Sequence, residues 1–332
     1  MAQLFSERLL AAIKAPFESL ISPTSGFSLL FLGLTLLFCA GIYAVRARRP
    51  LRLRTLRRFL LPRGVILHAS AKLDYKYYFV AAALRAGMLG SMVMSSAAVS
   101  HLAINLLTGS FGTFTPLAAP LYLMIPAVTV AQVLLFDLGY WIGHRAMHEI
   151  PLLWEFHKTH HAAEVLTPVT SARSRPVDDL IQMNAIAATS GLGYGALVYL
   201  FGETAQPVTL LETNIIFFVF FLSIFHLRHS HIWLPISGWL GYIIQSPAHH
   251  QIHHSTAPRH HGKNLGFCLS LWDWVFGTLY MPDKREEIEF GLGRESAEFA
   301  TVKDLLLRPF SKAARLFVRR TAPAPAVVEH ET

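Results

Sequence analysis

Histidines in this chain gather in one region and recur at spacings of three and four residues. Fourteen of the 17 histidines lie between His144 and His261. Residues three or four positions apart lie on one face of a helix, and neutral imidazole is the commonest metal ligand in proteins. This pattern predicts that several segments of the chain bind metal ions together.

Four groups have this spacing. They are, in chain order, His144 and His148; His157, His160 and His161; His226 and His229; and His250, His253 and His254. A tetrahedral zinc takes four ligands, so this many imidazoles exceed what one ion needs. Two ions, each with several ligands and an open position, fit better, and paired ions in such sites lie about 3.5–4 Å apart. A surface cluster without metal remains the alternative for any single group.

The other histidines fit this pattern less well. His231 is out of register with His226 and His229, so we leave it out of the predicted site. We expect His249 to support a neighbouring ligand rather than to bind metal itself. Surface, capping or supporting roles are expected for the rest: His68, His101, His260, His261 and His330.

The composition indicates that membrane helices position these groups. The 332 residues are 53% hydrophobic and 15% charged, with a mean hydropathy of +0.40, whereas soluble domains carry about 25% charged residues. About 20 apolar residues cross a bilayer as a helix. Stretches of that kind occur at residues 27–45, within 78–107, within 117–143, at 181–201 and at 207–225. The predicted fold is all-α: a multi-pass membrane helix bundle of about four to five spanning helices with a cytoplasmic helical cap that carries a histidine-rich dimetal site.

Two details refine this bundle. The short segment 202–207 predicts a helical hairpin between the last two spans, and Arg85, inside the second span, must face the protein interior or reach the interface. The two cysteines, Cys39 and Cys268, form no CxxC motif, so neither a disulfide framework nor a thiolate metal site is indicated.

Basic residues predict the orientation of the bundle. Eight arginines and no acid occur in residues 46–63, directly after the first apolar stretch. A nucleic-acid patch is one interpretation, but a cytoplasmic loop beside a membrane helix is the better one. Counting spans from this loop places every histidine group on the cytoplasmic side. The protein would then be a multi-pass integral membrane protein of the bacterial cytoplasmic membrane or the endoplasmic reticulum.

The chain divides into four predicted segments. Residues 1–26 form an amphipathic interfacial helix, because apolar residues recur at helical spacing there. Residues 27–135 hold the N-terminal transmembrane helices and the basic loop 46–63. Residues 136–282 form the catalytic domain, and residues 283–332 form a cytoplasmic C-terminal segment with a disordered tail.

The histidine groups and their flanking residues resemble the fatty acid hydroxylase superfamily, also called the sterol desaturase family. The resemblance covers about residues 136–280, from the stretch DLGYWIGHRAMH to the stretch KNLGFCLSLWDWVFGT. Matching flanking residues are Asp137, Tyr140, Trp141, Arg145, Trp154, Lys263, Asn264, Gly266, Trp272, Asp273, Phe276, Gly277 and Thr278. The chain departs from the family where Arg175 replaces a histidine, and where His226 and His229 lie three rather than four residues apart.

The resemblance implies a non-haem di-iron centre that uses O₂ to hydroxylate or desaturate a C–H bond of a lipid. Its ligands would be the ten histidines of the four groups. Among the flanking residues, we expect Asp137, His249, Asn264 and Asp273 to support ligands. Asp137 lies seven residues before His144 on the same helix face, so its carboxylate can accept the second ring N–H of that histidine; the alternative is an aspartate that simply reaches water.

Electrons must come from another protein, because the sequence has no dinucleotide, haem or flavin motif. We expect a ferredoxin or cytochrome b5 type donor with an NAD(P)H reductase, a lipid substrate from the bilayer, and no nucleic-acid partner. The competing hypothesis is a membrane transporter or binding protein for zinc or iron. A transporter needs polar ligands near the middle of its spans, and this sequence has few there.

Overall fold

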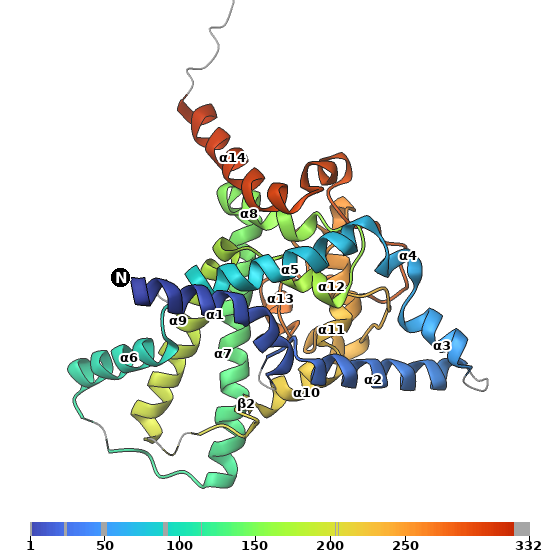
Figure 1. Ribbon diagram of the computed structural model, residues 1–332. Helices are drawn as coiled ribbons and strands as arrows, with labels where there is room; N and C mark the ends of the chain where they lie inside the picture. Colours follow the sequence, from blue (N-terminus) through green and yellow to red (C-terminus); the bar gives the residue numbers. More distant parts are fainter. Residues whose placement is uncertain are drawn as a thin grey trace, which may run out of the picture.

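The computed structural model describes residues 2–22, 25–47, 52–88, 92–113, 115–202, 204 and 206–321. Part of the predicted basic loop (48–51) and the predicted tail (322–332) lie outside the described residues. The described chain is mostly helical (Figure 1). Its one sheet is a two-stranded antiparallel ribbon of β1 (Thr209–Leu210) and β2 (Thr213–Asn214).

Three helices pack backbone against backbone and form the lower half of the molecule (Figure 1). They are α6 (Ser96–Phe111), α7 (Leu121–Glu149) and α9 (Pro176–Phe201). A Cβ atom on Gly139 of α7 would lie 2.6 Å from the Cα of Ile186, and one on Gly195 would lie 2.6 Å from the carbonyl oxygen of Ser100. Small residues therefore allow these helices their close approach, as is common between membrane helices.

The N-terminal helices lie across and beside this unit (Figure 1). They are α1 (Ala2–Ile21), α2 (Leu29–Ala47), α3 (Leu53–Leu60), α4 (Arg63–Ile66) and α5 (Ala69–Met88). The hydroxyl of Tyr78 donates to the carbonyl of Pro16 at 2.9 Å and ties α5 to α1. The predicted segment 1–26 contains the helix α1, on which Leu9, Ile13 and Phe17 are exposed. Its amphipathic role at a membrane interface stays a prediction.

The remaining helices and turns lie mostly in the upper half of the molecule (Figure 1). The α-helices are α8 (Pro151–His161), α10 (Ile215–Ser223), α11 (Phe225–Arg228), α12 (Pro247–His253), α13 (Leu271–Val275) and α14 (Val302–Thr321). The 3₁₀ turns are η1 (Pro168–Arg173), η2 (Gly238–Tyr242), η3 (Pro258–His260) and η4 (Gly293–Phe299). Of these elements, α10 lies lower, beside α2 and β2 (Figure 1).

Among the described helices, only α7 is long and apolar enough to cross a membrane; Leu29–Val45 is apolar but shorter. The other predicted spans stay predictions, with two exceptions. The stretch 78–107 is divided between α5, which ends at Met88, and α6, which begins at Ser96 and has 16 residues, so it contains no single helix of spanning length. The stretch 207–225 contains the β1–β2 ribbon and then α10 of nine residues, which is only about 13 Å long. A spanning fifth helix, and the helical hairpin before it, are therefore wrong predictions. Leu211 and Glu212 have positive φ angles in the turn of the ribbon, which helix geometry does not allow.

Arg85 faces the protein interior, as expected. Its Nε lies 2.5 Å from a carboxylate oxygen of Asp179, and its guanidinium also donates to the Ser174 hydroxyl. The pair joins α5 to the start of α9, so the charge inside an apolar stretch is balanced by an acid from another helix.

A buried ion pair fixes the segment that follows the second histidine group. The side chains of Arg173 in η1 and Asp74 in α5 are 1% and 0% exposed. The second carboxylate oxygen of Asp74 accepts from the Thr170 hydroxyl at 2.8 Å, and Arg173 also donates to the carbonyl and hydroxyl oxygens of Ser70 at 3.1 Å. These hydrogen bonds therefore all require the same arrangement of η1 against α5.

We predict that Asp74→Ala destabilises the fold strongly, because it leaves the Arg173 guanidinium buried without a counter-ion. The expected loss is about 3–5 kcal/mol in free energy of unfolding. The matched control is Arg308→Ala, which removes an exposed pair with Asp304 at 3.3 Å and should cost less than about 1 kcal/mol. Thermal unfolding in detergent measures both changes; equal midpoints for the two variants would contradict the prediction.

Candidate metal centre

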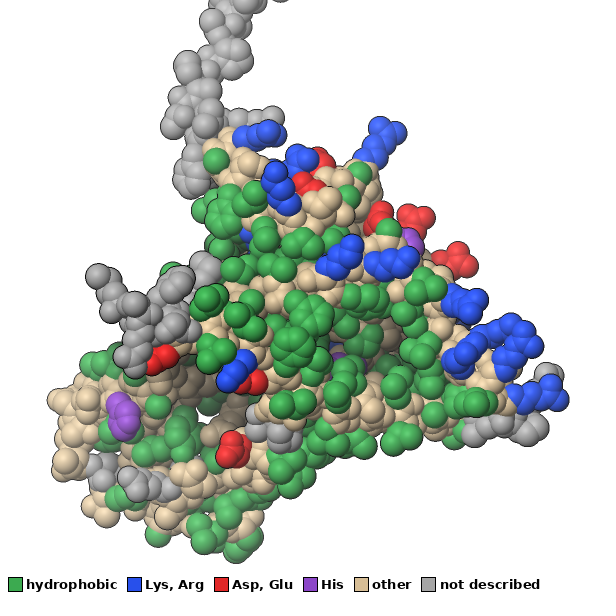
Figure 2. Space-filling model, viewed as in Figure 1, with side chains coloured by type: hydrophobic (Ala, Val, Ile, Leu, Met, Phe, Trp, Pro, Cys, Tyr) green, Lys and Arg blue, Asp and Glu red, His purple; other side chains and the backbone are tan. Residues whose placement is uncertain are grey.

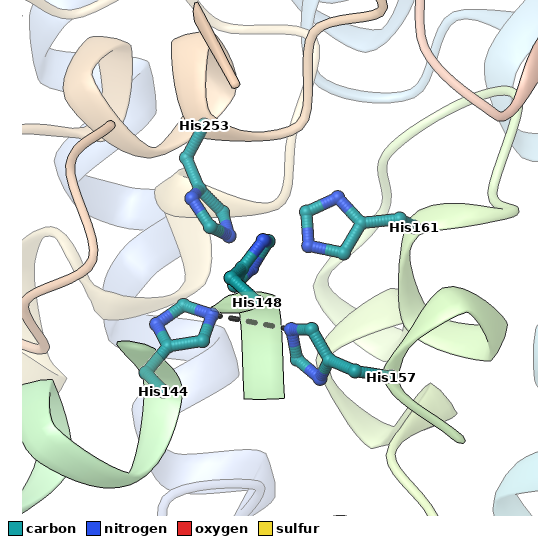
Figure 3. A group of neighbouring side chains, drawn as sticks. All are labelled: His144, His148, His157, His161 and His253. Carbon is teal, nitrogen blue, oxygen red and sulfur yellow. Dashed lines mark hydrogen bonds between the residues drawn. The ribbon is translucent and has the colours of Figure 1, made fainter. Parts of the chain in front are cut away.

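The predicted histidines converge on two neighbouring sets of ring nitrogens. The five-histidine group consists of His144, His148, His157, His161 and His253, and the four-histidine group consists of His160, His229, His250 and His254. Within each group, the possible ligand atoms all lie within 4.8 Å of one another. Figure 3 shows the five rings of the first group pointing toward a common centre. Nine of the ten predicted ligands are thus brought together; the exception is His226.

Helical spacing explains how short segments supply both groups. His144 and His148 are one turn apart at the end of α7, where both reach the five-histidine group. In α8, His157 and His161 point to that group, and His160 between them points to the four-histidine group. In α12, His250 belongs to the four-histidine group and His253 to the other, and His254, just after the helix, joins His250. The adjacent pairs 160–161 and 253–254 are therefore each divided between the two groups.

The nitrogens of the four-histidine group lie unusually close together. The Nε2 atom of His229 is 3.2 Å from that of His160, 3.1 Å from that of His254 and 3.0 Å from that of His250. Each neutral imidazole has one acceptor nitrogen, which repels another acceptor unless a proton or a cation lies between them. A shared metal ion satisfies all of these nitrogens at once.

The five-histidine group also contains ring nitrogens that lack a partner in the described part of the chain. The Nε2 atoms of His148, His161 and His253 are buried and have no hydrogen-bond partner among the described residues. Buried polar atoms are normally paired, so these nitrogens need a partner of another kind. Both groups therefore have the donor chemistry of a metal site.

Burial keeps these rings in the neutral form that binds metal. Loss of solvent lowers the pKa of His253 to about 3. The same cause, followed by repulsion from neighbouring rings, lowers the pKa of His160, His161 and His254 well below 6.5. Burial, followed by the Arg228 charge, does the same for His250. Burial also lowers the pKa of His229, where the Arg228 charge acts in the same direction. A lone pair is thus available at neutral pH on the rings of His160, His161, His229, His250, His253 and His254.

Two backbone carbonyls orient ligands of the five-histidine group. The Nδ1 atom of His144 lies 2.6 Å from the carbonyl oxygen of Leu265, and the Nδ1 atom of His253 lies 2.9 Å from that of Lys263. A carbonyl only accepts hydrogen bonds, so each Nδ1 carries the proton and each Nε2 is free for a metal. Both carbonyls belong to residues 263–269, which we call the 263–269 loop.

Buried carboxylates hold this loop in place. Asp273 accepts from the backbone N–H groups of Leu265 and Gly266 at 2.8 and 2.9 Å. Asp137 accepts from those of Cys268 and Leu269 at 2.7 and 3.2 Å. The expected bond from His144 to Asp137 is therefore a wrong prediction, because the Leu265 carbonyl occupies that ring nitrogen. Asp137 instead supports the loop that supplies this carbonyl.

Asn264 and His249 also act on the backbone. Asn264 has a φ of +56°, and its side-chain amide donates to the carbonyl of His249 at 3.0 Å and accepts from the N–H of Tyr280 at 2.8 Å. The Nδ1 atom of His249 lies 2.7 Å from the hydroxyl of Ser246, the residue that caps α12. Both residues hold the helix and loop around the ligands, and neither belongs to the two histidine groups.

His226 is placed outside both groups. Its ring packs against Phe27 and Phe225, with ring centroids 6.2 and 5.0 Å away, and burial lowers its pKa to about 4. His229, the other predicted ligand of this segment, lies at the centre of the four-histidine group. His231, which the sequence analysis left out, lies 2.7 Å from the carbonyl of Phe59.

Three supporting features were not predicted. Asp178 lies 3.8 Å from the Nδ1 atom of His157, with both side chains buried. Its position at the start of α9 is typical of a helix cap, so the sequence does not predict its contact with His157. Arg228 is 2% exposed and donates to the carbonyl of Phe267 in the 263–269 loop. The carbonyls of Lys263 and Leu265 are backbone groups, so no residue type in the sequence marks their role.

We predict that His229→Ala loses the metal bound by the four-histidine group, whereas His226→Ala keeps it. The reason is that His229 Nε2 lies within 3.2 Å of three other ring nitrogens and His226 contacts none of them. Elemental analysis of the purified variants measures metal per chain. Loss of metal in His226→Ala alone would contradict the assignment.

A second prediction concerns the 263–269 loop. Asp273→Asn replaces one of the acceptor oxygens that hold Leu265 and Gly266, so the carbonyl on His144 should shift. We expect metal affinity to fall about 10- to 100-fold, the usual effect of losing a partner that orients a ligand. Competition with a chelator measures the affinity. The control is the exposed Asp283→Asn, and equal affinities in the two variants would disprove the role of the loop.

Known proteins share this central region. Residues 129–278 match the family model named fatty acid hydroxylase. Similar curated proteins include the ornithine lipid hydroxylase of Rhizobium tropici, 26% identical over 61% of this chain and 56% of that protein. The human alkylglycerol monooxygenase is 28% identical over 50% of this chain and 33% of its own length. A Delta(7)-sterol 5(6)-desaturase of Gibberella zeae is 30% identical over 43% and 40%, respectively.

The chain spans between a quarter and about half of the length of the first of these relatives. No solved structure matches it significantly. Both histidine groups and the 263–269 loop lie inside the matched residues. The region from residue 129 to residue 278 belongs to the fatty acid hydroxylase and sterol desaturase superfamily.

Proposed function

We propose that this protein is a membrane-bound di-iron oxygenase that uses O₂ and two electrons to hydroxylate or desaturate a C–H bond of a lipid. The observation that carries the proposal is the pair of buried imidazole groups within the matched region. The relatives are named as a monooxygenase, a hydroxylase and a desaturase of lipids, which supports a lipid-modifying oxidoreductase.

The donor set supports iron as the metal. Imidazole suits iron, zinc and copper, but zinc has no redox chemistry, and the named reactions of the relatives are oxidations. One iron would be held by the five-histidine group and the other by the four-histidine group; when bound, the pair supplies the activation of O₂. The protein's part is to keep the rings neutral, to fix their tautomers through the 263–269 loop and to exclude water.

A cavity offers a place for a lipid chain. It has a volume of about 760 Å³ and lies between α6, α7, α9 and α10, within the usual size range of ligand sites. Phe136 and Phe217 line it. Phe136 also contacts Phe267, whose ring lies 4.9 Å from that of Tyr140, and the Tyr140 ring lies 5.4 Å from that of His144. We propose that the lipid chain lies in the cavity and passes this aromatic layer to reach the metal pair.

The electron donor and the location belong to the same proposal. A ferredoxin or cytochrome b5 type protein with an NAD(P)H reductase would deliver the electrons at the cytoplasmic face of a bacterial cytoplasmic membrane or of the endoplasmic reticulum. A metal transporter remains the competing function. The clustering of the ligands at one end of α7, rather than along its middle, supports the oxygenase.

Two measurements on the full chain test the proposed function. We expect two irons per purified chain, and we expect mass spectrometry to find a lipid product in expressing cells, heavier by one oxygen or lighter by two hydrogens. His253→Ala should lose iron and product together, whereas the exposed His261→Ala should keep both. Readily exchanged zinc without a changed lipid would favour transport and contradict the oxygenase.

A further inference from the structure

A second hollow lies at the junction of α3 and α4. Its residues are distant in sequence from both histidine groups. Its volume is about 590 Å³, and its lining consists of Arg54, Arg57, Arg58, Leu61, Pro62 and Arg63. Figure 2 shows Lys and Arg side chains gathered at this edge of the molecule, at the place where Figure 1 shows α3. Four guanidinium groups therefore surround one concave site.

No carboxylate balances these four charges within the described part of the chain. Five arginines elsewhere do have acidic partners: Arg85 pairs with Asp179, Arg145 with Glu149, Arg173 with Asp74, Arg259 with Glu286, and Arg308 with Asp304. Arg57 and Arg58 lie three and four residues after Arg54 on α3, so their charges and that of Arg54 repel one another. An anion in the hollow would remove this repulsion.

The chemistry of the lining indicates which anion fits. A guanidinium group presents its N–H donors as a planar fork that binds two phosphate oxygens at once. Exposed leucines flank the arginines: Leu53 is 81% exposed and Leu61 49% exposed. On the adjoining α2, Leu37 and Val45 are 69% and 80% exposed. Cationic and apolar side chains that alternate in this way are typical of a segment in the headgroup region of a membrane.

We propose that this hollow binds the phosphate group of an anionic phospholipid, with Leu53 and Leu61 in contact with its chains. A soluble phosphate would use the same arginines but would leave the leucines in water. An acidic protein surface would need charge but no hollow. The lipid is the occupant that accounts for the arginines, the concave shape and the leucines together.

The site is connected to the metal centre through α3. Phe59 packs beside the buried residues Cys39, Leu227 and Ile232, and its carbonyl lies 2.7 Å from the Nε2 atom of His231. His231 follows the metal-group residue His229 by two positions. A phospholipid that holds α3 in place would therefore also steady the segment that carries His229.

The test is a titration of the purified full chain in detergent with dioleoylphosphatidylglycerol, followed by native mass spectrometry and thermal unfolding. Dioleoylphosphatidylcholine and inorganic phosphate are the comparison ligands. We expect one phosphatidylglycerol retained per chain, a higher unfolding temperature, and about tenfold weaker binding of either comparison ligand. Equal stabilisation by inorganic phosphate would overturn the lipid assignment.

Three sets of variants separate a built site from general attraction. Arg54→Lys, Arg57→Lys and Arg58→Lys together keep the charge but lose the guanidinium fork, and the same three positions changed to Gln lose both. The lysine set should weaken binding about tenfold, and the glutamine set by at least as much. The control changes Arg285, Arg294 and Arg315 to Gln, which removes the same charge elsewhere and should leave binding unchanged.

These experiments distinguish a failure of the lipid-site proposal from a failure of the proposed metal centre. Binding retained in the lysine set would mean that charge alone suffices, and an equal loss in the control would mean nonspecific attraction; either result overturns the proposal. Metal content confirms that each variant is folded. If a triple variant fails to fold, the single variant Arg58→Lys, with an expected loss of about threefold, decides the question.

Discussion

The structure depends on the convergence of neutral imidazole nitrogens that have nothing to bind but one another. Nine histidines from α7, α8, α12 and the segment around His229 place these nitrogens within 4.8 Å of their group neighbours. Acceptor nitrogens repel at such distances, and buried rings cannot take up protons cheaply. The surrounding helices must therefore hold an arrangement that a cation between the nitrogens would relieve, and the buried Asp137, Asp273 and Asn264 help to hold it.

The 263–269 loop shows how this is done. Its carbonyls orient His144 and His253, and buried side chains from separate elements hold its amides: Asp273 beside the loop and Asp137 on α7. Arg228 donates to the loop from the other side and packs over the ring of Phe267 at 4.7 Å. These acids thus position the backbone, and both groups that could hold a metal ion consist of histidines alone.

Much of the candidate metal centre could be predicted, because its histidines are grouped within short segments of the chain. A spacing of three or four residues on a helix determines which rings share a face, and those spacings are visible in the sequence. What was not visible arises from contacts over more than a hundred residues, such as His144 with the Leu265 carbonyl. His226 and His229 could not be told apart, because α11 ends at Arg228 and the change in backbone direction there decides which ring faces the metals. The helical prediction for 207–225 failed because hydropathy does not reveal that residues 209–214 turn back on themselves as a ribbon.

The division of adjacent histidines between the two groups has a geometric consequence. His160 and His161 are joined by a peptide bond, as are His253 and His254, and in each pair the two rings serve different groups. Consecutive Cα atoms lie 3.8 Å apart whatever the rest of the protein does. The two groups are therefore joined by a peptide bond at two independent places, so a backbone shift at either place displaces rings of both groups together.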